Sequence, residues 1–367
     1  MLQDLQEYAL SAVPHLKVLG RTNGSLAPLT LFWTGSALEV NVRAAGLWAE
    51  VEADFSQLEQ WAAVTVNGQV ISRFPLPAGR HWLCLFRGMD PAKAKSVRLV
   101  KEVQAMPGDP QARLQVHALR TDGSFLPVEA RGRRLEFIGD SITSGEGLVG
   151  AQEEQDWIPL FFSAVYGFPM LAAGLCGADY RVVSQSGWGV RSSWDNNPHC
   201  TLPGVYDRVC GPLTGQANQD LGAQAPYDFA AWQPDAVVIN LGTNDGGAVR
   251  QPPWQDPATG ACFQQEGNRA GRAAFTGAAV AFLKQLRARN PGAFLLWAYG
   301  MLGREMAGAI REAVAAYRRE TGDLRADFLL LPDTGRDLMG SRGHPGRKAH
   351  AQAAQILADY LETVWEA

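Results

Sequence analysis

The chain has 367 residues, which at roughly 150 residues per domain predicts about two domains. Hydrophobic residues make up 46% of the sequence and charged residues 19%, so the chain has ample apolar surface to form cores, and global disorder is excluded. The 33 Lys and Arg residues are balanced by 37 Asp and Glu, giving a net charge of −4. Because no segment concentrates Lys and Arg into a patch that could neutralise a run of phosphates, the sequence argues against nucleic acid as a partner.

The N-terminal segment, Met1 to Glu7, lacks the basic region and the apolar core of an export signal. We therefore expect a cytoplasmic protein, although a trimmed secreted form would look the same. Residues 157–178 contain no charged residue. The stretch is therefore as long as a membrane-spanning helix, which needs ~20 apolar residues. Pro and Gly residues interrupt this stretch, so we expect a buried, broken helix and no membrane partner.

Five cysteines are widely spaced and form no C-x-x-C pair. This usage fits a reduced compartment or at most one disulfide, which would join Cys200 to Cys210. A metal site built from His199, Cys200, Cys210 and Cys262 matches no common zinc spacing. We expect neither a metal nor a cofactor, and the oligomeric state stays open.

The first third of the chain alternates apolar and polar residues with period two, which is typical of half-buried strands. Tight hairpins are expected at Asn67-Gly68 and at Asp122-Gly123, because these residues tolerate a positive φ. The pattern predicts an antiparallel, jelly-roll-like β-sandwich over residues 1–130. The clearest strand segments lie at 38–43, 47–52, 64–66, 97–99 and 114–117.

After Arg131–Arg134 the period changes, and short apolar runs alternate with segments of helical spacing. This alternation predicts a parallel sheet covered by helices on both faces, forming an α/β domain over residues 131–367. The apolar runs occupy 135–138, 181–184, 236–240, 294–297 and 328–331, and the helical segments occupy 271–289, 304–320 and 347–366. In such sheets the working site lies at the carboxyl ends of the strands.

Four segments that follow these runs carry residues suited to acyl transfer. Ser141 lies at a strand-to-helix turn, and Gly187 and Asn244 follow the next two strands. His344 precedes the last helix. Ser141 is a candidate nucleophile or a helix N-cap, Gly187 a backbone donor or an ordinary loop glycine, and Asn244 an amide donor or part of an Asx-turn. His344 is a candidate general base or a structural histidine, and Asp245 is expected to brace its loop. All four fall where one site is expected, which favours the catalytic interpretation.

The four segments resemble the sequence blocks of the SGNH (GDSL-like) hydrolases. Gly139-Asp140-Ser141-Ile142 resembles the nucleophile block, and the resemblance implies that Ser141 is the nucleophile and His344 its base. It also implies an oxyanion hole made by the N–H groups of Ser141 and Gly187 and by the side-chain amide of Asn244.

The β-sandwich ahead of this domain, with the segment Val238 to Asp245, is similar to the arrangement in carbohydrate esterase family 2. That resemblance implies an esterase that removes O-acetyl groups from plant oligo- or polysaccharides of the mannan or xylan type, through an acetyl-serine. Two alternatives stay open: a carbohydrate-binding protein without catalysis, and a lipase- or thioesterase-like hydrolase for longer acyl chains.

One position departs from the SGNH pattern. The family places Asp three residues before the catalytic His, and here that residue is Ser341. His344 must then be oriented by something else. The resemblance implies a Ser-His dyad steered by a backbone carbonyl, for which residues 341 and 342 are candidates, and Asp333 and Asp337 are the alternatives if the loop doubles back.

An acetylated oligosaccharide also needs apolar platforms, because the C–H face of a pyranose packs on aromatic rings. Trp188 and Trp194 closely follow Gly187, and Trp254 lies in the loop after Asn244. Each is a candidate platform or an ordinary core residue, and Trp254 is the best candidate platform, because its segment Gln251 to Asp256 looks like a loop.

Overall fold

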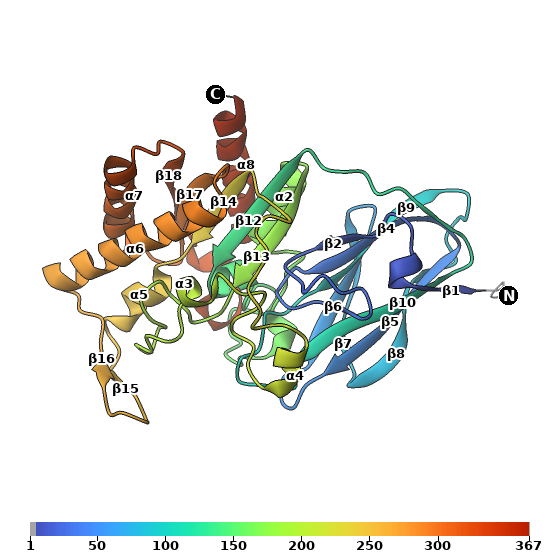
Figure 1. Ribbon diagram of the computed structural model, residues 1–367, viewed down its shortest axis with the longest axis horizontal. Helices are drawn as coiled ribbons and strands as arrows, with labels where there is room; N and C mark the ends of the chain where they lie inside the picture. The colour runs from blue at the N-terminus through green and yellow to red at the C-terminus, as the bar shows by residue number, and fades with distance from the viewer. Residues whose placement is uncertain (1–4, 367) are drawn as a thin grey trace. The chain divides into compact units, whose positions relative to one another are not determined.

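The computed structural model describes residues 5–366 (Figure 1). Residues 1–4, on which part of the expectation about an export signal rests, lie outside the described residues, as does residue 367. The described chain divides into two compact units. Unit 1 comprises residues 5–131, 158–165 and 208–227, and unit 2 comprises 132–157, 166–207 and 228–366. The domain boundary at residues 130/131 stays a prediction.

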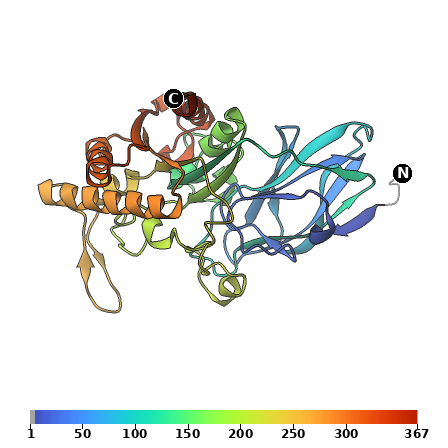
Figure 2. The same ribbon diagram turned by 45° about the horizontal axis from the view of Figure 1, so that its top comes forward.

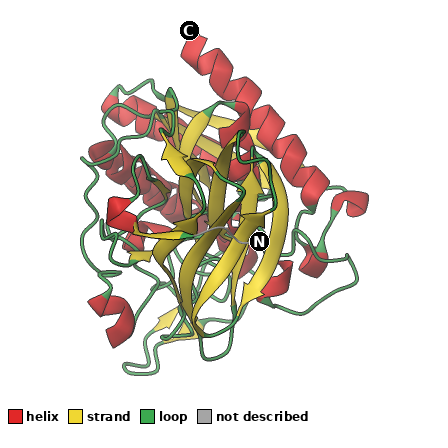
Figure 3. Ribbon diagram, turned by 90° about the vertical axis from the view of Figure 1, so that its right-hand side faces the viewer, coloured by secondary structure: helices red, strands yellow, loops and turns green. Residues whose placement is uncertain are grey.

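Unit 1 is built from two antiparallel sheets, whose strands are drawn yellow in Figure 3. One has the order β1-β10-β5-β8, with β3 also paired to β10, and the other has the order β11-β4-β9-β6-β7, with β2 paired to β4. The strands are β1 (Gln6–Ala9), β2 (Lys17–Leu19), β3 (Leu29–Thr30), β4 (Ala37–Arg43), β5 (Gly46–Asp54), β6 (Gln60–Val66), β7 (Gln69–Leu76), β8 (Gly79–Arg87), β9 (Ala94–Lys101), β10 (Arg113–Thr121) and β11 (Ser124–Leu126). Short helices η1 (Leu10–Ala12), η2 (Pro159–Phe161) and α4 (Gln216–Asp220) complete the unit.

The two sheets share one apolar core, which confirms the expected sandwich. Alternate residues of β5, such as Ala49 and Val51, are fully buried, and they belong to the same cluster as Val40 and Val42 of β4 in the other sheet. Successive side chains of a strand point to opposite faces, so the period of two in the sequence supplies one apolar face per sheet. The turn at Asn67-Gly68 closes the β6–β7 hairpin, as predicted.

The prediction of a tight hairpin at Asp122-Gly123 is wrong. The strands on its two sides belong to different sheets: β10 pairs with β5, and β11 pairs with β4. Here Asp122 accepts hydrogen bonds from the N–H groups of Ala45 and Gly46. A Cβ on Gly123 would lie 1.8 Å from the carbonyl oxygen of Arg43. The glycine therefore permits a close approach of two main chains where the chain changes sheets, rather than a tight turn.

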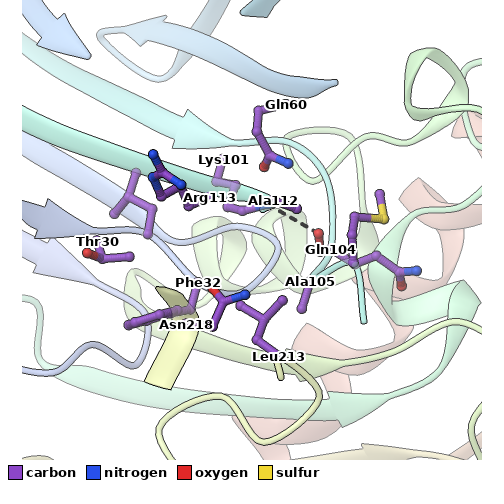
Figure 4. A pocket seen from close by; sticks show the side chains of 12 residues that line it. Thr30, Phe32, Gln60, Lys101, Gln104, Ala105, Ala112, Arg113, Leu213 and Asn218 are labelled. Carbon is purple, nitrogen blue, oxygen red and sulfur yellow. Dashed lines mark hydrogen bonds between the residues drawn. The ribbon is translucent and has the colours of Figure 1, made fainter. Parts of the chain in front are cut away.

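A small cavity of about 10 Å³ in unit 1 is bordered by the buried Lys101 (Figure 4). Its ammonium group donates to the carbonyl oxygens of Val103 at 2.8 Å and Gln104 at 3.2 Å. Burial lowers the pKa of Lys101 to about 7, because removing the charged form from water costs free energy.

Unit 2 contains a parallel sheet of order β13-β12-β14-β17-β18, as expected. Its strands are β12 (Arg133–Gly139), β13 (Ala178–Ser184), β14 (Ala236–Asn240), β17 (Phe294–Met301) and β18 (Ala326–Asp333). The helices are α1 (Ser141–Ser144), α2 (Phe168–Leu175), α3 (Leu202–Val205), α5 (Thr243–Ala248), α6 (Arg269–Arg289), α7 (Ala307–Thr321), α8 (Arg347–Glu366), η3 (Arg336–Leu338) and η4 (Ser341–Gly343). A hairpin of β15 (Trp254–Gln255) and β16 (Cys262–Phe263) lies between α5 and α6.

Helices cover both faces of this sheet. Phe137 of β12 contacts Phe168 of α2, and Trp297 of β17 contacts Phe282 of α6. Phe137 is in register with Val238 and, through it, with Leu296, so Trp297 points to the opposite face from Phe137. The pair α2 and α8 therefore packs on one face and the pair α6 and α7 on the other (Figure 1).

The uncharged stretch 157–178 forms the short helices η2 and α2 with irregular chain between them, as its prolines and glycines predict. Within residues 5–366 no helix combines the length and the apolar character needed to cross a bilayer.

Candidate active site

Three neighbouring strands of the parallel sheet, β13, β12 and β14, end level with one another. Gly139, the last residue of β12, is in register with Ser184 at the end of β13 and with Asn240 at the end of β14. The segments that follow these strands therefore begin side by side. This arrangement brings Ser141, Gly187 and Asn244 to the same edge of the sheet, as the sequence predicts.

Ser141 is the first residue of α1 and is held by a tight strand-to-helix turn. The side chain of Asp140 caps the helix by accepting the N–H of Ile142 at 3.1 Å. A Cβ on Gly139 would lie 1.9 Å from the hydroxyl of Thr143 and 2.9 Å from the carbonyl oxygen of Asn240. Only glycine lets β12 pass so close to these neighbours, and this close packing fixes where the Ser141 hydroxyl points.

His344 meets this hydroxyl directly. Its Nε2 lies 2.9 Å from Oγ of Ser141, and its Nδ1 lies 3.0 Å from the carbonyl oxygen of Arg342. A carbonyl can only accept, so Nδ1 carries the proton and Nε2 is left as the acceptor for the Ser141 O–H. Of the orienting groups that the sequence left open, the structure contains the Arg342 carbonyl, whereas Asp333 accepts from the N–H of Gly303.

Arg342 adopts the left-handed conformation, with φ 55° and ψ 29°. This conformation is uncommon for a residue with a side chain and persists where the surroundings hold it. The N–H of Arg342 donates to the carbonyl oxygen of Glu154 at 2.9 Å, and its guanidinium donates to Gln155 O and Glu146 Oε1. These contacts hold the carbonyl of Arg342 within hydrogen-bond distance of Nδ1 of His344.

A second close approach joins the histidine loop, the segment that contains Ser341 and His344, to the loop after Ser141. The N–H of Ser341 donates to the carbonyl oxygen of Gly147 at 2.9 Å. Gly147 has φ +68°, and a Cβ there would lie 2.3 Å from Ser341 O and 2.9 Å from Cβ of His344. Glycine at 147 is therefore required for His344 to reach Ser141.

Asn244 lies in the first turn of α5, beside Asp140 and the chain after β13. Its amide nitrogen donates to Oδ2 of Asp140 at 3.2 Å and to the carbonyl oxygen of Trp188 at 3.0 Å. Burial, aided by the negative charges of Asp245 and Glu146, raises the pKa of Asp140 to about 7 against the opposing hydrogen bond from Ile142. The amide is thus oriented by two acceptors before any substrate arrives.

Asp245 braces the site, as expected from the sequence. Its buried carboxylate accepts the N–H groups of Val190 and Arg191, each at 2.8 Å, and the side-chain amide of Gln265 at 2.9 Å. Burial raises the pKa of Asp245, although these hydrogen bonds oppose the shift. The bonds to Val190 and Arg191 tie the loop that contains Gly187 to helix α5, which carries Asn244 and Asp245.

The three candidate tryptophans have different surroundings. Trp194 is 52% exposed, and its main-chain N–H donates to the carbonyl oxygen of Gly187 at 2.8 Å. Its indole ring lies against Gly187, where an added Cβ would be 2.9 Å from Cδ1 of the ring. Trp188 is half-buried beside Asn244, to which its carbonyl is bonded. Trp254 lies on the β15–β16 hairpin, which extends away from α5 and α6 (Figure 2), and its ring packs edge-to-face on His199. The structure therefore places Trp188 and Trp194 next to the candidate oxyanion donors.

Glu146 is the residue near the site that the sequence analysis did not single out. Its side chain is only 5% exposed, and its Oε1 lies 3.2 Å from Nε of Arg342 and 3.8 Å from Nε2 of His344. The available signal was an acidic residue within the glycine-rich segment Ser144 to Gly150, directly after the nucleophile turn.

Within residues 5–366, no cluster of three or more His, Cys, Asp or Glu side chains is arranged to hold a metal ion. All five cysteines are free thiols, so the disulfide left open between Cys200 and Cys210 is not formed.

Residues 137–352, more than half of the chain, match the GDSL-like Lipase/Acylhydrolase family. The structure is similar to that of Est2A, an acetyl xylan esterase from the rumen bacterium Butyrivibrio proteoclasticus, with a TM-score of 0.97, 42% identity and 99% coverage of both chains. A relative from Cellvibrio japonicus, an acetylxylan esterase / glucomannan deacetylase, is 25% identical over 96% of this chain and 90% of its own. The fold is also that of a family two carbohydrate esterase from Clostridium thermocellum in complex with cellohexaose, with a TM-score of 0.80, 21% identity and coverage of 96% of this chain and 99% of that chain.

Proposed function

Because this chain belongs to the GDSL-like lipase/acylhydrolase family and, within it, to carbohydrate esterase family 2, we propose that it deacetylates plant oligo- or polysaccharides of the xylan or mannan type. The observation that carries the proposal is the 2.9 Å contact between Nε2 of His344 and Oγ of Ser141, with Nδ1 held by a carbonyl. The names of the relatives from Butyrivibrio and Cellvibrio support the substrate class.

In the proposed mechanism, His344 takes the proton of Ser141 as Oγ attacks the acetyl carbon, which becomes tetrahedral. The imidazolium then passes the proton to the sugar oxygen as the ester C–O bond breaks, leaving acetyl-Ser141. Water, activated by His344, attacks the acetyl group, and the serine leaves with the proton. Acetate and the free sugar hydroxyl are the products.

The developing oxyanion would be stabilised by the N–H groups of Ser141 and Gly187 and by the amide of Asn244. Asn244 already donates to Asp140 and Trp188 O, so its amide would have to share a proton with the oxyanion. Preorganised donors of this kind do not need to reorient during the reaction, which is why they stabilise the transition state effectively.

We propose Trp194 as a platform for the acetylated sugar, because its exposed ring adjoins Gly187. Trp188 is a second candidate near the same donors. The role of Trp254 as a platform stays a prediction, since the ring contact of this hairpin residue is with His199.

The test is acetate release from acetylated xylan, acetylated glucomannan and their oligosaccharides, measured with the wild type and with Ser141→Ala. We expect release from at least one polymer by the wild type and none above background by the variant. Binding of the oligosaccharides without acetate release would instead favour a binding protein. A higher kcat/KM on p-nitrophenyl octanoate than on p-nitrophenyl acetate would favour a hydrolase for longer acyl chains.

A further inference from the structure

The site lacks the acidic residue that normally completes a Ser-His-Asp triad, since Ser341 occupies its place. In a triad the acid does two things: it orients the imidazole, and its negative charge stabilises the imidazolium formed during the reaction. In this chain the carbonyl of Arg342 orients His344. A carbonyl oxygen carries only a partial charge, so the second task requires another group.

Glu146 lies where a charge can act on this imidazole. Its carboxylate is almost fully buried, and Oε1 is 3.8 Å from Nε2 of His344, the atom that receives the proton of Ser141. At such a distance in a partly buried site, the interaction of two opposite charges is considerably stronger than in water. The separation also exceeds the range of an N–H···O hydrogen bond, about 2.7–3.2 Å. The carboxylate therefore attracts the imidazolium without capturing the proton that the leaving sugar oxygen needs.

The same carboxylate is connected to the orienting group. Oε1 of Glu146 accepts from Nε of Arg342 at 3.2 Å, and the main chain of Arg342 supplies the carbonyl that accepts from Nδ1 of His344. The N–H of Glu146 donates to the carbonyl oxygen of Ser141 at 3.0 Å, which fixes its position relative to the nucleophile turn. One ion pair thus holds the left-handed residue 342 and keeps a negative charge next to Nε2.

We propose that Glu146 is a positioning residue that, together with Arg342, replaces the missing triad acid: the Arg342 carbonyl orients His344 and the Glu146 carboxylate stabilises its protonated form. This inference rests on the proposed function, because it assigns a role within the Ser141–His344 reaction. It places the acid on the opposite side of the imidazole from the usual one, in the segment after the nucleophile rather than in the segment before the base.

The decisive variant is Glu146→Gln, which keeps the size of the side chain and an oxygen able to accept from Arg342 but removes the charge. With p-nitrophenyl acetate as probe, we expect kcat to fall by roughly 10- to 100-fold, since general acid–base catalysis contributes about 10²- to 10⁴-fold and only part of it depends on this charge. KM should change less than about threefold, because Glu146 acts on the transition state and not on the bound ester.

Glu146→Asp keeps the charge at a shorter reach and should recover a substantial part of kcat. The matched control is Glu153→Gln, which removes an exposed carboxylate from the same loop and should leave kcat and KM unchanged. Circular dichroism and the midpoint of thermal unfolding establish that each variant is folded. If Glu146→Gln does not fold, Glu146→Asp decides the question by itself, since a kcat as low as that of Ser141→Ala in a folded protein would contradict a role for the charge.

The outcomes separate the two proposals. If the wild type hydrolyses acetyl esters and Glu146→Gln has the same kcat, the role of Glu146 is overturned and the esterase remains. Equal losses of kcat in the folded Gln and Asp variants would also overturn it, because geometry rather than charge would then matter. A wild type without activity on any acetyl ester would instead contradict the proposed function itself.

Discussion

The two halves of the active site are built in different ways. Ser141, Gly187 and Asn244 follow strands that end level in the parallel sheet, so the sheet itself brings them together. His344 lies in an irregular segment, and its position depends on loop-to-loop contacts made by Gly147 and Arg342. The strand side is fixed by hydrogen-bonded register, whereas the loop side is fixed by a few close approaches. Changes on the loop side should therefore affect activity as strongly as the loss of a catalytic group.

Gly147→Ala tests the loop side and should have the largest effect. The new Cβ would clash with Ser341 O and His344, so the histidine loop must move away from Ser141. We expect kcat/KM on p-nitrophenyl acetate to fall by about 10²- to 10⁴-fold, the usual contribution of a positioned acid–base group. The matched control is Gly177→Ala, which has a similar positive φ of 57° but open space around it. An active Gly147→Ala enzyme would show that the loops are not rigidly docked.

Asn244→Ala tests the strand side. It removes an amide aimed by Asp140 Oδ2 and Trp188 O, and loss of one oxyanion donor typically costs about 10²- to 10³-fold in kcat. Binding of an acetylated oligosaccharide to the variant, measured by calorimetry, should be nearly unchanged. A loss of binding with unchanged kcat would assign Asn244 to the substrate and remove it from the oxyanion hole.

Asp140→Asn tests the strand side through the pH dependence of the free energy of unfolding. Burial raises the pKa of Asp140 to about 7 from an ordinary 3.8, so between these values the folded state binds a proton that the unfolded chain has released. The contribution of Asp140 to stability is therefore complete below about pH 4 and is lost as the pH rises to about 7. The free energy of unfolding of the wild type, measured with urea, should fall relative to the Asn variant over this range. A constant difference from pH 4 to pH 7 would contradict the assignment.

Trp194→Ala should have the smallest effect. A sugar ring that loses its aromatic partner should bind about 3- to 10-fold more weakly, in line with the ~0.5–1.5 kcal/mol of aromatic pair contacts. KM for an acetylated xylo-oligosaccharide should rise, while kcat on p-nitrophenyl acetate should stay the same. Trp254→Ala is the matched comparison, because both side chains are tryptophans but only Trp194 adjoins Gly187. A rise in KM for Trp254→Ala but not for Trp194→Ala would instead assign the platform to Trp254 on the β15–β16 hairpin.

The contrast between the strand side and the loop side also explains how much of the fold and of the site the sequence predicts. The sandwich and the parallel sheet follow from hydrophobic period, and Ser141 and Asn244 follow from their places after strands. The Arg342 carbonyl was only one of several candidates, because a main-chain atom is available at any residue type and its direction depends on φ and ψ. Glu146 was missed because its contact with Arg342 joins residues 196 positions apart. The turn at Asp122-Gly123 was misjudged because local residue preference does not reveal which sheet the next strand enters.

The buried Lys101 gives unit 1 a response to pH opposite to that of Asp140 in unit 2. Its pKa is lowered to about 7 from 10.5, so between these values the unfolded chain holds a proton that the folded unit does not. The free energy of unfolding of unit 1 should therefore increase as the medium becomes alkaline. Near neutral pH neither group stabilises its unit. Lowering the pH below 7 increases the free energy of unfolding of unit 2 through Asp140, and raising it above 7 increases that of unit 1 through Lys101.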